Sequence, residues 1–483
     1  NPSITVTGID NNTSVNGQVS INVSATDNVG ILKVEFYVNN QLASTITSVP
    51  YVYNWDTTTI IDGIYPLKIK AYDTSLNTSE QNFLVNVDNN FNGTFERVLK
   101  ISTEGSDAIG YSIMEDDGGY VFVGHASEHV ETSNTANDVF IIKLDVRGNI
   151  ISQNKSDIGA YDFPRDFIKA DDGGYVIVGE TYINQGNSGD RVDAFMLKTD
   201  NEGIMEWKQT YDSNSSGGGD IAFTIYPSGS NYKVGAGLGS SGSYGPVASL
   251  IETDLSGSLV SELTTNYTHG LTVGYYCFVY NWDKFSNYSP MMSLTNDGGY
   301  IFGGMIHDSN ASTYQLKLVR LGSDGKTLQW ANIYGGGSPG WIGKVTLEAS
   351  DGTILLAGHH STVSYTHGDV VLLKTDSTGN QLWLHKYDTS GTINSIYETN
   401  DGGYVLAGYT TATATGNRDV YILKTDSNGN ELWSKTFGGD YNDSAMNIKQ
   451  TSDGGYIIVG CYGENNGDVS DVLSFYVLRT DYD

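Results

Sequence analysis

The hydrophobic positions of this chain fall into many short runs rather than into long amphipathic stretches. Residues 447–451 alternate between polar and apolar, and residues 455–460 form a continuous apolar run that ends at a glycine. In the preceding unit, residues 420–426 and 432–437 are equally rich in β-branched and aromatic side chains. Each run is short and is bounded by Gly, Asp or Asn, so the pattern predicts units of four antiparallel strands.

A turn motif, Asp-Gly-Gly-Tyr or a close variant, recurs with these runs. It begins at Asp117, Asp172, Asp297, Asp351, Asp401 and Asp453, and a degraded copy at 228–232 fills the one long gap. The starts lie 50 to 69 residues apart. A period in this range with strand-like runs in every unit predicts a β-propeller. The motif is expected to join the first strand of a blade to the second, because glycine enters positive φ cheaply and Asp caps its own turn.

The ends of the array predict how the ring closes. The last unit stops at residues 477–481, the end of a third strand, and an isolated strand at 95–101 precedes the first unit. If that strand completes the last blade, no sheet edge stays open at the seam. The sequence therefore predicts seven four-stranded blades. The tryptophans that follow the second hairpin are expected to pack between neighbouring blades, at positions 207, 330, 383 and 433.

The first ninety residues have a different rhythm. Residues 19–25, 32–38 and 65–71 alternate with period two, and turn signals separate them at the spacing of a β-sandwich. The expected domains are a sandwich at 1–89, a linker at 90–94 and the propeller at 95–483. The strand at 4–7 is expected either to pair within its own sandwich or to add to the open sheet edge of a neighbouring molecule.

Particular words in the sandwich resemble a known family. The segments at 27–30 (Asp-Asn-Val-Gly), 34–37 (Val-Glu-Phe-Tyr), 53–56 (Tyr-Asn-Trp-Asp), 62–63 (Asp-Gly) and 71–73 (Ala-Tyr-Asp) resemble the bacterial immunoglobulin-like domains of secreted and surface proteins. The repeats resemble the Asp-Gly-Gly-Tyr propellers of prokaryotic exported proteins. They lack the recurring Gly-His and Trp-Asp pairs that mark WD40 repeats. These resemblances imply an all-β chain, an immunoglobulin-like sandwich plus a seven-bladed propeller closed by strand 95–101, at the cell surface or outside the cell. Neither resemblance carries an active site.

The net charge argues against some classes of binding partner, and the cysteines argue against a disulfide. The formal net charge is −30, and such a surface repels phosphate backbones and anionic lipid heads, so no nucleic acid is expected. No run of about twenty apolar residues exists that would span a membrane. The two cysteines, Cys277 and Cys461, fall in units about half a ring apart and are expected to be buried free thiols.

One loop is a candidate binding site for Ca²⁺. The sequence indicates no cofactor that the protein requires. Oxygen-bearing side chains around a glycine resemble short calcium loops seen on other propellers, at Asp212, Asn214, Ser216 and Asp220. The alternative is a glycine-rich loop held by Asx-turns. His125, Glu180 and His359 follow the glycine of the second strand in three units, but their separation predicts no metal centre.

An insertion at 264–288 is the candidate surface for a ligand or partner. It is rich in aromatic side chains, which bind sugars or anchor proteins, and which equally could plug the channel: Tyr275, Tyr276, Phe278, Tyr280, Trp282, Phe285 and Tyr288. Asn-x-Ser/Thr sequons make further asparagines candidates for glycosylation: Asn11, Asn22, Asn77, Asn92, Asn266, Asn310 and Asn442.

The sequence lacks the catalytic motifs that would indicate a serine hydrolase, a zinc protease or a P-loop enzyme. The expectation is a non-enzymatic extracellular or cell-surface protein that assembles with itself into a filament or surface layer, with the sandwich as connector. The first alternative is a carbohydrate-binding or adhesive module that uses the aromatic insertion and binds surface glycans or proteins. The second is a secreted enzyme that degrades polysaccharides, through paired carboxylates that sequence spacing does not reveal.

Overall fold

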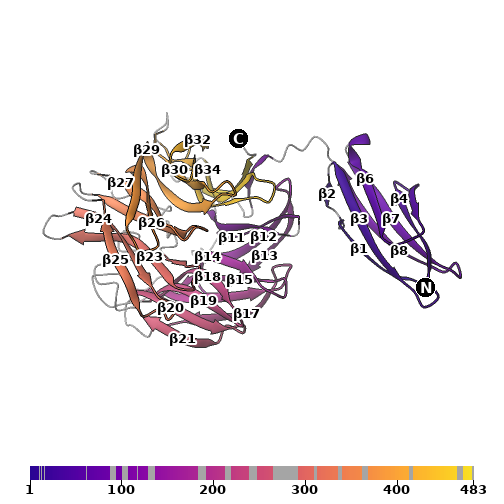
Figure 1. Ribbon diagram of the computed structural model, residues 1–483, viewed down its shortest axis with the longest axis horizontal. Coiled ribbons are helices and arrows are strands. Elements are labelled where there is room, and N and C mark those ends of the chain that lie inside the picture. Colours follow the sequence, from indigo (N-terminus) through magenta and orange to yellow (C-terminus); the bar gives the residue numbers. More distant parts are fainter. Residues whose placement is uncertain are drawn as a thin grey trace. The chain divides into compact units, whose positions relative to one another are not determined.

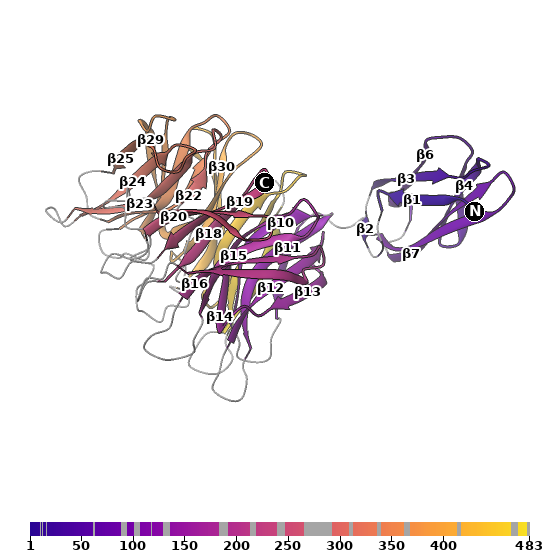
Figure 2. The same ribbon diagram turned by 90° about the horizontal axis from the view of Figure 1, so that it is seen from below.

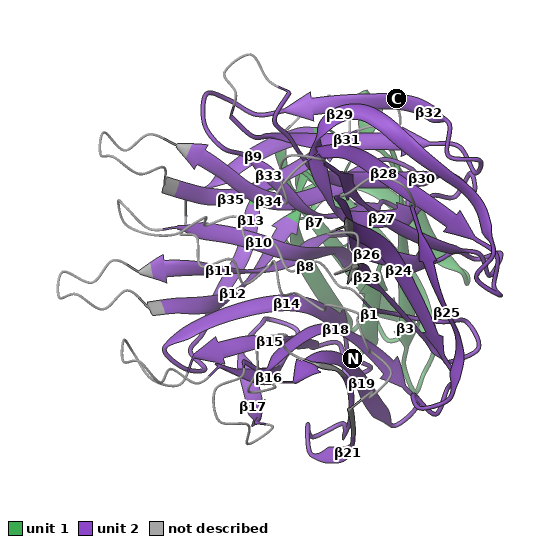
Figure 3. Ribbon diagram, turned by 90° about the vertical axis from the view of Figure 1, so that its left-hand side faces the viewer, with its two compact units in different colours: residues 1–94, 145–149 green, residues 95–144, 150–483 purple. Residues whose placement is uncertain are grey.

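The structure is a computed structural model of the 483-residue chain. The chain divides into two compact units (Figure 3): unit 1 comprises residues 1–94 and 145–149, and unit 2 comprises residues 95–144 and 150–483. Among the described residues no helix is long and apolar enough to cross a membrane. The residues that the structure describes are 1–9, 11, 13–15, 17–60, 63–87, 94–100, 107–116, 118–128, 136–182, 192–212, 219–238, 247–264, 292–308, 313–335, 340–361, 368–412, 417–464 and 472–480.

Unit 1 is a sandwich of two sheets around one core, antiparallel except where the short β2 pairs parallel with β8. The three-stranded sheet comprises β1 (Ser3–Thr7), β3 (Gln18–Thr26) and β6 (Tyr51–Asp56), and the 3-10 helix η1 (Thr57–Thr59) follows it. The five-stranded sheet comprises, in spatial order, β2 (Ser14–Val15), β8 (Thr78–Val87), β7 (Gly63–Asp73), β4 (Ile31–Val38) and β5 (Gln41–Ile46). Alternate residues face the core, which contains Ile21, Phe36, Trp55, Ile69 and Val85. The predicted sandwich is confirmed.

The first strand of the chain belongs to its own sandwich. Strand β1 pairs antiparallel with β3, from Ser3 opposite Thr26 to Thr7 opposite Asn22. Of the two expectations for this strand, pairing within the chain is the one that the structure has. The backbone groups that strand addition to a neighbour would use on this side of β1 are therefore already bonded.

Unit 2 is a succession of antiparallel meanders of four strands. The first two meanders are β10 (Ala108–Asp116), β11 (Gly119–Glu128), β12 (Ala136–Asp145) and β13 (Ile150–Ser156), then β14 (Tyr161–Lys169), β15 (Tyr175–Tyr182), β16 (Val192–Thr199) and β17 (Met205–Tyr211). The third and fourth are β18 (Ile221–Ser228), β19 (Asn231–Leu238), β20 (Val247–Asp254) and β21 (Leu259–Thr264), then β22 (Met292–Leu294), β23 (Tyr300–Asp308), β24 (Thr313–Leu321) and β25 (Leu328–Tyr334).

The fifth and sixth meanders share one long strand, and the seventh includes a strand from far upstream in the sequence. The fifth and sixth are β26 (Trp341–Glu348), β27 (Ile354–His360), β28 (Gly368–Thr375) and β29 (Gln381–Glu398), which continues as the first strand before β30 (Tyr404–Thr410), β31 (Asp419–Thr425) and β32 (Glu431–Phe437). The seventh is β33 (Ser444–Gln450), β34 (Tyr456–Glu464), β35 (Val472–Thr480) and β9 (Phe95–Leu99). As the sequence predicts, the strand that precedes the repeats pairs with the last meander, with Phe475 opposite Leu99. The meanders succeed one another around unit 2, with β13 and β25 at opposite sides of it (Figures 1 and 2).

In the five turn motifs whose Asp lies among the described residues, that Asp does more than cap its turn. Asp401 accepts a hydrogen bond from the backbone N–H of Gly403 at 2.9 Å, and it also pairs with the buried ammonium of Lys424 on β31, at 2.9 Å. The same pairing between the turn Asp and a buried cation of the third strand occurs at Lys198–Asp172, Arg320–Asp297, Lys374–Asp351 and Arg479–Asp453. The repeat therefore ties the third strand to the turn between the first two, which the sequence analysis did not foresee.

A second contact joins the first, fifth, sixth and seventh meanders to the one before each of them, through Glu115, Glu348, Glu398 and Gln450. Glu398, at the end of β29, accepts hydrogen bonds from the N–H and hydroxyl of Ser350 in the preceding turn, at 2.7 and 2.8 Å. Glu115 on β10 contacts Ser452 in the same way, at 2.8 and 3.1 Å. Because β10 opens the first meander and Ser452 belongs to the seventh, the first and last meanders meet through the contact that joins internal neighbours.

The tryptophans lie between meanders, as predicted. Trp207, Trp330 and Trp383 each lie against a glycine in the hairpin of the next meander, where an added Cβ would approach the ring to within 2.6 to 2.8 Å: Gly257, Gly379 and Gly429. Trp433 instead lies against Tyr456, with ring centroids 5.8 Å apart. Glycine is required at the first three positions both for this approach and for its positive φ. Cys461 is a buried free thiol, as expected, and Cys277 lies outside the described residues.

Candidate functional site

The first strands of the meanders share a β-bulge at one position. Within the described residues, six of them shift register there, at 110–112, 164–166, 222–224, 343–345, 393–395 and 445–447. A bulge adds one residue to the strand and re-aims the side chains around it. The residue after the bulge differs from one meander to the next: Ser112, Asp166, Thr224, Val345, Ser395 and Asn447.

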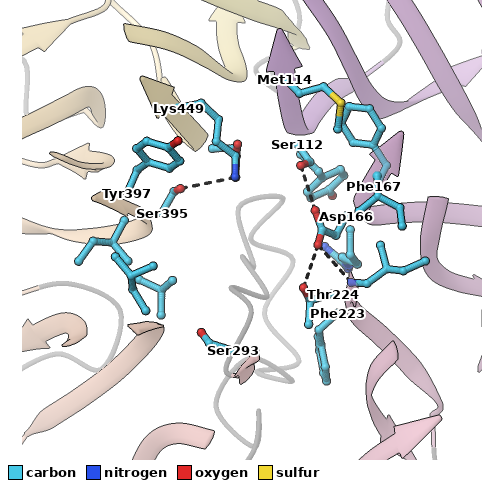
Figure 4. A pocket seen from close by; sticks show the side chains of 18 of the residues that line it. Ser112, Met114, Asp166, Phe167, Phe223, Thr224, Ser293, Ser395, Tyr397 and Lys449 are labelled. Carbon is cyan, nitrogen blue, oxygen red and sulfur yellow. Dashed lines mark hydrogen bonds between the residues drawn. The ribbon is translucent and has the colours of Figure 1, made fainter. Parts of the chain in front are cut away.

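These strands enclose a cavity of about 580 Å³ (Figure 4). Its lining comes from the first strand of all seven meanders, at 111–115, 165–168, 223–227, 292–294, 345–348, 394–397, 446–447 and 449–450. A volume of this size accommodates a small organic ligand such as a short oligosaccharide. The lining mixes aromatic rings with charged and polar side chains, so the cavity suits a ligand with both hydroxyl groups and apolar faces.

Asp166 is the central group of one wall. Its Oδ1 accepts a hydrogen bond from the Ser112 hydroxyl at 3.1 Å, and its Oδ2 accepts one from the Thr224 hydroxyl at 2.9 Å and one from the backbone N–H of Ile225 at 3.3 Å (Figure 4). The carboxyl thus bridges three successive meanders. Burial raises the pKa of Asp166, and the positive charge of Lys449 and the hydrogen bond from Thr224 offset this only in part.

The opposite wall carries a cation and amides. The Lys449 ammonium lies 5.3 Å from the centre of the Tyr397 ring, and the Asn447 amide donates to the Ser395 hydroxyl at 3.5 Å (Figure 4). Nearby, the Asn394 amide donates to the Ala445 carbonyl at 2.8 Å. The amide oxygens of Asn394 and Asn447 are buried and have no hydrogen-bond partner in the described part of the chain. Such acceptors on a polar cavity are placed for water or for a ligand hydroxyl.

A buried cluster of charged and aromatic side chains lies next to Asp166 and reaches the cavity lining through Tyr111 and Arg165. Arg165 pairs with Glu180 at 2.5 Å and lies 4.9 Å from the centre of the Tyr111 ring, on the cavity lining. The His125 ring lies 5.6 Å from the Tyr111 ring, and burial and the charge of Arg165 lower the pKa of His125 to about 3, so its imidazole is neutral. His359 is elsewhere and contacts the Thr392 hydroxyl at 3.1 Å. Of the three residues that the sequence places at equivalent positions, His125 and Glu180 therefore share one cluster and His359 does not.

The chemistry of the cavity centres on Asp166. The other carboxylates of its described lining are Glu115, which accepts hydrogen bonds from Ser452, and Glu348, which pairs with Arg320 at 3.5 Å. Burial also raises the pKa of Glu348. Asp166 accepts hydrogen bonds from hydroxyl groups and a backbone N–H, and within the described residues it makes no ion pair. Sequence reasoning missed Asp166, because the side chains that contact it lie on strands about 55 residues away in the sequence.

The predicted ligand surface is not among these residues. The aromatic side chains of the insertion lie outside the described residues: Tyr275, Tyr276, Phe278, Tyr280, Trp282, Phe285 and Tyr288. Among the sequons, Asn92, Asn266 and Asn310 also lie outside them. Asn11, Asn22 and Asn77 are exposed and Asn442 is half-buried, and their glycosylation stays a prediction.

The predicted calcium loop gains one carboxylate that the sequence did not point to. Asp212 and Asp220 lie together with Asp193 of β16, with one oxygen of each within 4.8 Å of the others. Asn214 and Ser216 lie outside the described residues. A second group of the same kind, Asp138, Asp157 and Asp162, occupies the corresponding place one meander earlier. Carboxylates at this separation suit a divalent cation, and Ca²⁺ binding here stays a prediction.

Comparisons with known proteins bear on both units. The family model described as bacterial Ig domain matches residues 2–69. The N-terminal module is an Ig-like domain. Fibronectin(III)-like modules of Clostridium thermocellum CbhA are 22% identical over 18% of this chain and 98% of theirs, with a TM-score of 0.17. No curated protein matches the chain.

For the larger unit the solved structures that resemble the chain include enzymes. The endo-arabinase of Bacteroides thetaiotaomicron is 11% identical over 65% of this chain and 92% of its own, with a TM-score of 0.33. The sucrose-6-phosphate hydrolase of Lactobacillus gasseri is 11% identical over 77% of this chain and 89% of its own, with a TM-score of 0.36. At such identities the likeness is one of fold alone.

These neighbours contradict two expectations from the sequence. The chain was expected to be a non-enzymatic structural protein that assembles with itself, whereas the neighbours include enzymes named for carbohydrate substrates. The expectation rested on missing catalytic motifs, and an active site assembled from separate strands of a fold leaves no local motif in the sequence. The expectations of self-assembly and of an absence of enzymatic activity are therefore withdrawn.

Proposed function

We propose that unit 2 is a closed seven-bladed β-propeller of the Asp-Gly-Gly-Tyr type, with the cavity on its axis. Two observations support this proposal. The cavity takes its lining from the first strands of all seven meanders, and the first meander contacts the last through Glu115–Ser452 and through Arg479, whose Nε donates to the Tyr120 hydroxyl at 3.0 Å. Closure leaves no unpaired strand edge at the seam.

We propose further that the protein is an exported or cell-surface protein that binds a glycan in this cavity and cleaves it with acid assistance. The single observation that carries this proposal is the environment of Asp166. In the proposed hydrolysis a water molecule attacks the anomeric carbon and releases its proton to solvent, the glycosidic C–O bond breaks, and Asp166 gives a proton to the leaving oxygen and later regains one from solvent. Burial is the usual means of raising the pKa of a carboxyl towards that role. Lys449 and the amides of Asn394 and Asn447 face the same cavity and supply donors and acceptors for sugar hydroxyls.

The Ig-like module and the fold neighbours support the class of substrate. Ig-like domains of the matched family are bacterial, and carriage on an exported chain would bring the cavity to extracellular polysaccharides. The aromatic rings on the lining, Tyr111, Phe223 and Tyr397 among them, offer apolar area to the faces of sugar rings. The proposed partners are therefore extracellular or cell-surface glycans.

The test is a screen of the full chain against plant, algal and microbial polysaccharides, with release of reducing ends as the readout. The Asp166→Asn variant keeps the shape of the side chain and removes its proton, so release should fall at least about 100-fold. Glu398→Gln, at a meander junction outside the cavity lining, should leave release unchanged. Full activity in Asp166→Asn, or neither release nor binding of any glycan by the wild-type chain, would overturn the proposal.

A further inference from the structure

The outer face of the five-stranded sheet in unit 1 carries an ordered set of lysines and tyrosines. Strands β4 and β7 pair so that Tyr37 lies opposite Lys68, Glu35 opposite Lys70, and Lys33 opposite Tyr72. Alternate residues of these strands, such as Phe36 and Ile69, are fully buried in the core, so this set faces outward. The lysine–tyrosine face is defined here as Lys33, Tyr37, Lys68, Lys70 and Tyr72, each of which is half-buried.

This face reverses the charge of its surroundings. Residues 1–94 contain three cationic side chains, and all three are on this face, in a chain whose net charge is −30. Lys33 pairs with Glu35 at 2.6 Å. Within the described residues of the chain Lys68 and Lys70 make no ion pair, although Glu80 lies opposite Lys70 on β8. Two ammonium groups are therefore left to attract an anion.

The tyrosines hold these ammonium groups in place. The Lys68 ammonium lies 4.5 Å from the centre of the Tyr37 ring, and the Lys33 and Lys70 ammoniums lie 4.5 and 5.3 Å from the centre of the Tyr72 ring. A cation over an aromatic ring keeps its charge while its side chain loses freedom, so less entropy is lost when an anion binds. Lysines two residues apart on a strand stand roughly 7 Å apart, and this spacing repeats the charge along the strand.

We propose that the lysine–tyrosine face binds an anionic polysaccharide, one whose sugars carry carboxylate groups. The lysines pair with the carboxylates, and the exposed parts of the tyrosine rings contact the sugar rings between them. At physiological ionic strength charges beyond about 8 Å are largely screened. On the face itself three lysines stand against two carboxylates, Glu35 and Glu80, so one positive charge remains. This binding goes beyond the activity proposed for unit 2 and does not depend on it.

The experiment measures binding of the full chain to polygalacturonate, with its fully methyl-esterified form as the uncharged counterpart and single-stranded DNA as a different polyanion. The wild-type chain should bind polygalacturonate at low salt, bind the ester at least tenfold more weakly, and lose affinity as salt is raised. Lys68→Glu should weaken binding at least tenfold, and Tyr72→Ala several-fold. Lys326→Glu, an equal charge change in an exposed turn of unit 2, should leave binding unchanged.

Lys68→Gln removes the charge without adding another, and its thermal unfolding separates loss of binding from loss of the fold. A Lys68→Gln chain that melts like the wild type and binds more weakly supports the proposal. Equal binding by Lys68→Glu and the wild type, no binding of polygalacturonate, or tighter binding of DNA than of polygalacturonate would overturn it. Because the readout is binding, failure of sugar release at the cavity would leave this result unchanged.

Discussion

The first strands of unit 2 repeat at one end and vary in the middle. At the turn end, the residue three places after the bulge accepts a hydrogen bond from a backbone N–H of the preceding turn in four meanders, at Glu115, Glu348, Glu398 and Gln450. Lys169 and Pro227 stand at this position in the second and third meanders. After the bulge, the same position is Ser112, Asp166, Thr224, Val345, Ser395 or Asn447. The contact between neighbours thus recurs at four junctions, whereas the position on the cavity wall changes from each meander to the next. The contrast supports the proposal that the cavity is the functional site.

The largest expected effect comes from removing the strand that completes the repeat. Deletion of residues 1–103 takes away β9 and leaves the edge of β35 unpaired, so the chain should aggregate. Deletion of residues 1–94 keeps β9 and should give a monomer. Size-exclusion chromatography with light scattering distinguishes the two. A monomeric, cooperatively folded chain after the longer deletion would show that β9 does not hold the array closed.

The next effect is at the turns, where Asp401 pairs with Lys424. Asp401→Ala leaves the buried ammonium with only the Thr425 carbonyl, at 2.9 Å, and should cost about 2 kcal/mol in free energy of unfolding, a modest figure because Asp401 is half exposed. The pKa of Asp401 is about 2, below its ordinary value, so its contribution is present above about pH 4 and disappears as the pH falls towards 2. Chemical denaturation at pH 7 and pH 3 measures both effects on the free energy of unfolding. Asp388→Ala, at an exposed position, is the control. An equal loss of free energy in the control would refute the contribution of the Asp401–Lys424 pair.

A buried carboxyl at a meander junction has the opposite dependence on pH. Asp443 accepts hydrogen bonds from Gly439 and Gly463, and burial, with the nearby charge of Asp419, raises its pKa to about 6. A raised pKa favours the folded state at low pH, and that advantage is lost as the pH rises through 6. The wild-type chain should lose about 2 kcal/mol from this group between pH 4 and pH 7. Asp443→Asn should lack this slope in urea denaturation, and an unchanged slope would show that Asp443 titrates normally.

Junction contacts should each contribute less, and equally. Glu398→Ala removes two hydrogen bonds between half-exposed groups and should cost about 1 kcal/mol. Glu115→Ala should cost the same, because the seam between the last and first meanders uses the same contact. A silent Glu115→Ala beside a destabilising Glu398→Ala, measured by denaturant unfolding, would mean that the seam is not a junction like the others.

The smallest expected effect concerns calcium at the acidic group between the second and third meanders. Millimolar Ca²⁺ should raise the Tm by about 2–4 °C if Asp193, Asp212 and Asp220 bind it, since a ligand that binds only the folded state stabilises it. Asp193→Asn should abolish the shift, and Asp388→Asn should keep it. Differential scanning fluorimetry with and without chelator is sufficient. An equal shift in all three chains would place the calcium elsewhere.

The elements of the fold were predictable because they depend on local pattern. The alternation in residues 19–25 and the Asp-Gly-Gly turns mark strands and hairpins directly, and the missing fourth strand of the last unit pointed to 95–101. The partners of the turn aspartates were not predictable, because Lys424 looks like any lysine near a strand end. Asp166 was missed for a similar reason: its surroundings depend on Ser112 and Thr224, which the chain brings together only by packing three meanders side by side.

The most direct test of the account is a crystal structure of the Asp166→Asn variant soaked with an oligosaccharide that the wild-type chain cleaves. The account predicts sugar density inside the cavity, with the amide at position 166 within hydrogen-bonding distance of a glycosidic oxygen and Lys449 in contact with a hydroxyl. Density for the sugar at another place on unit 2, with only water in the cavity, would contradict it.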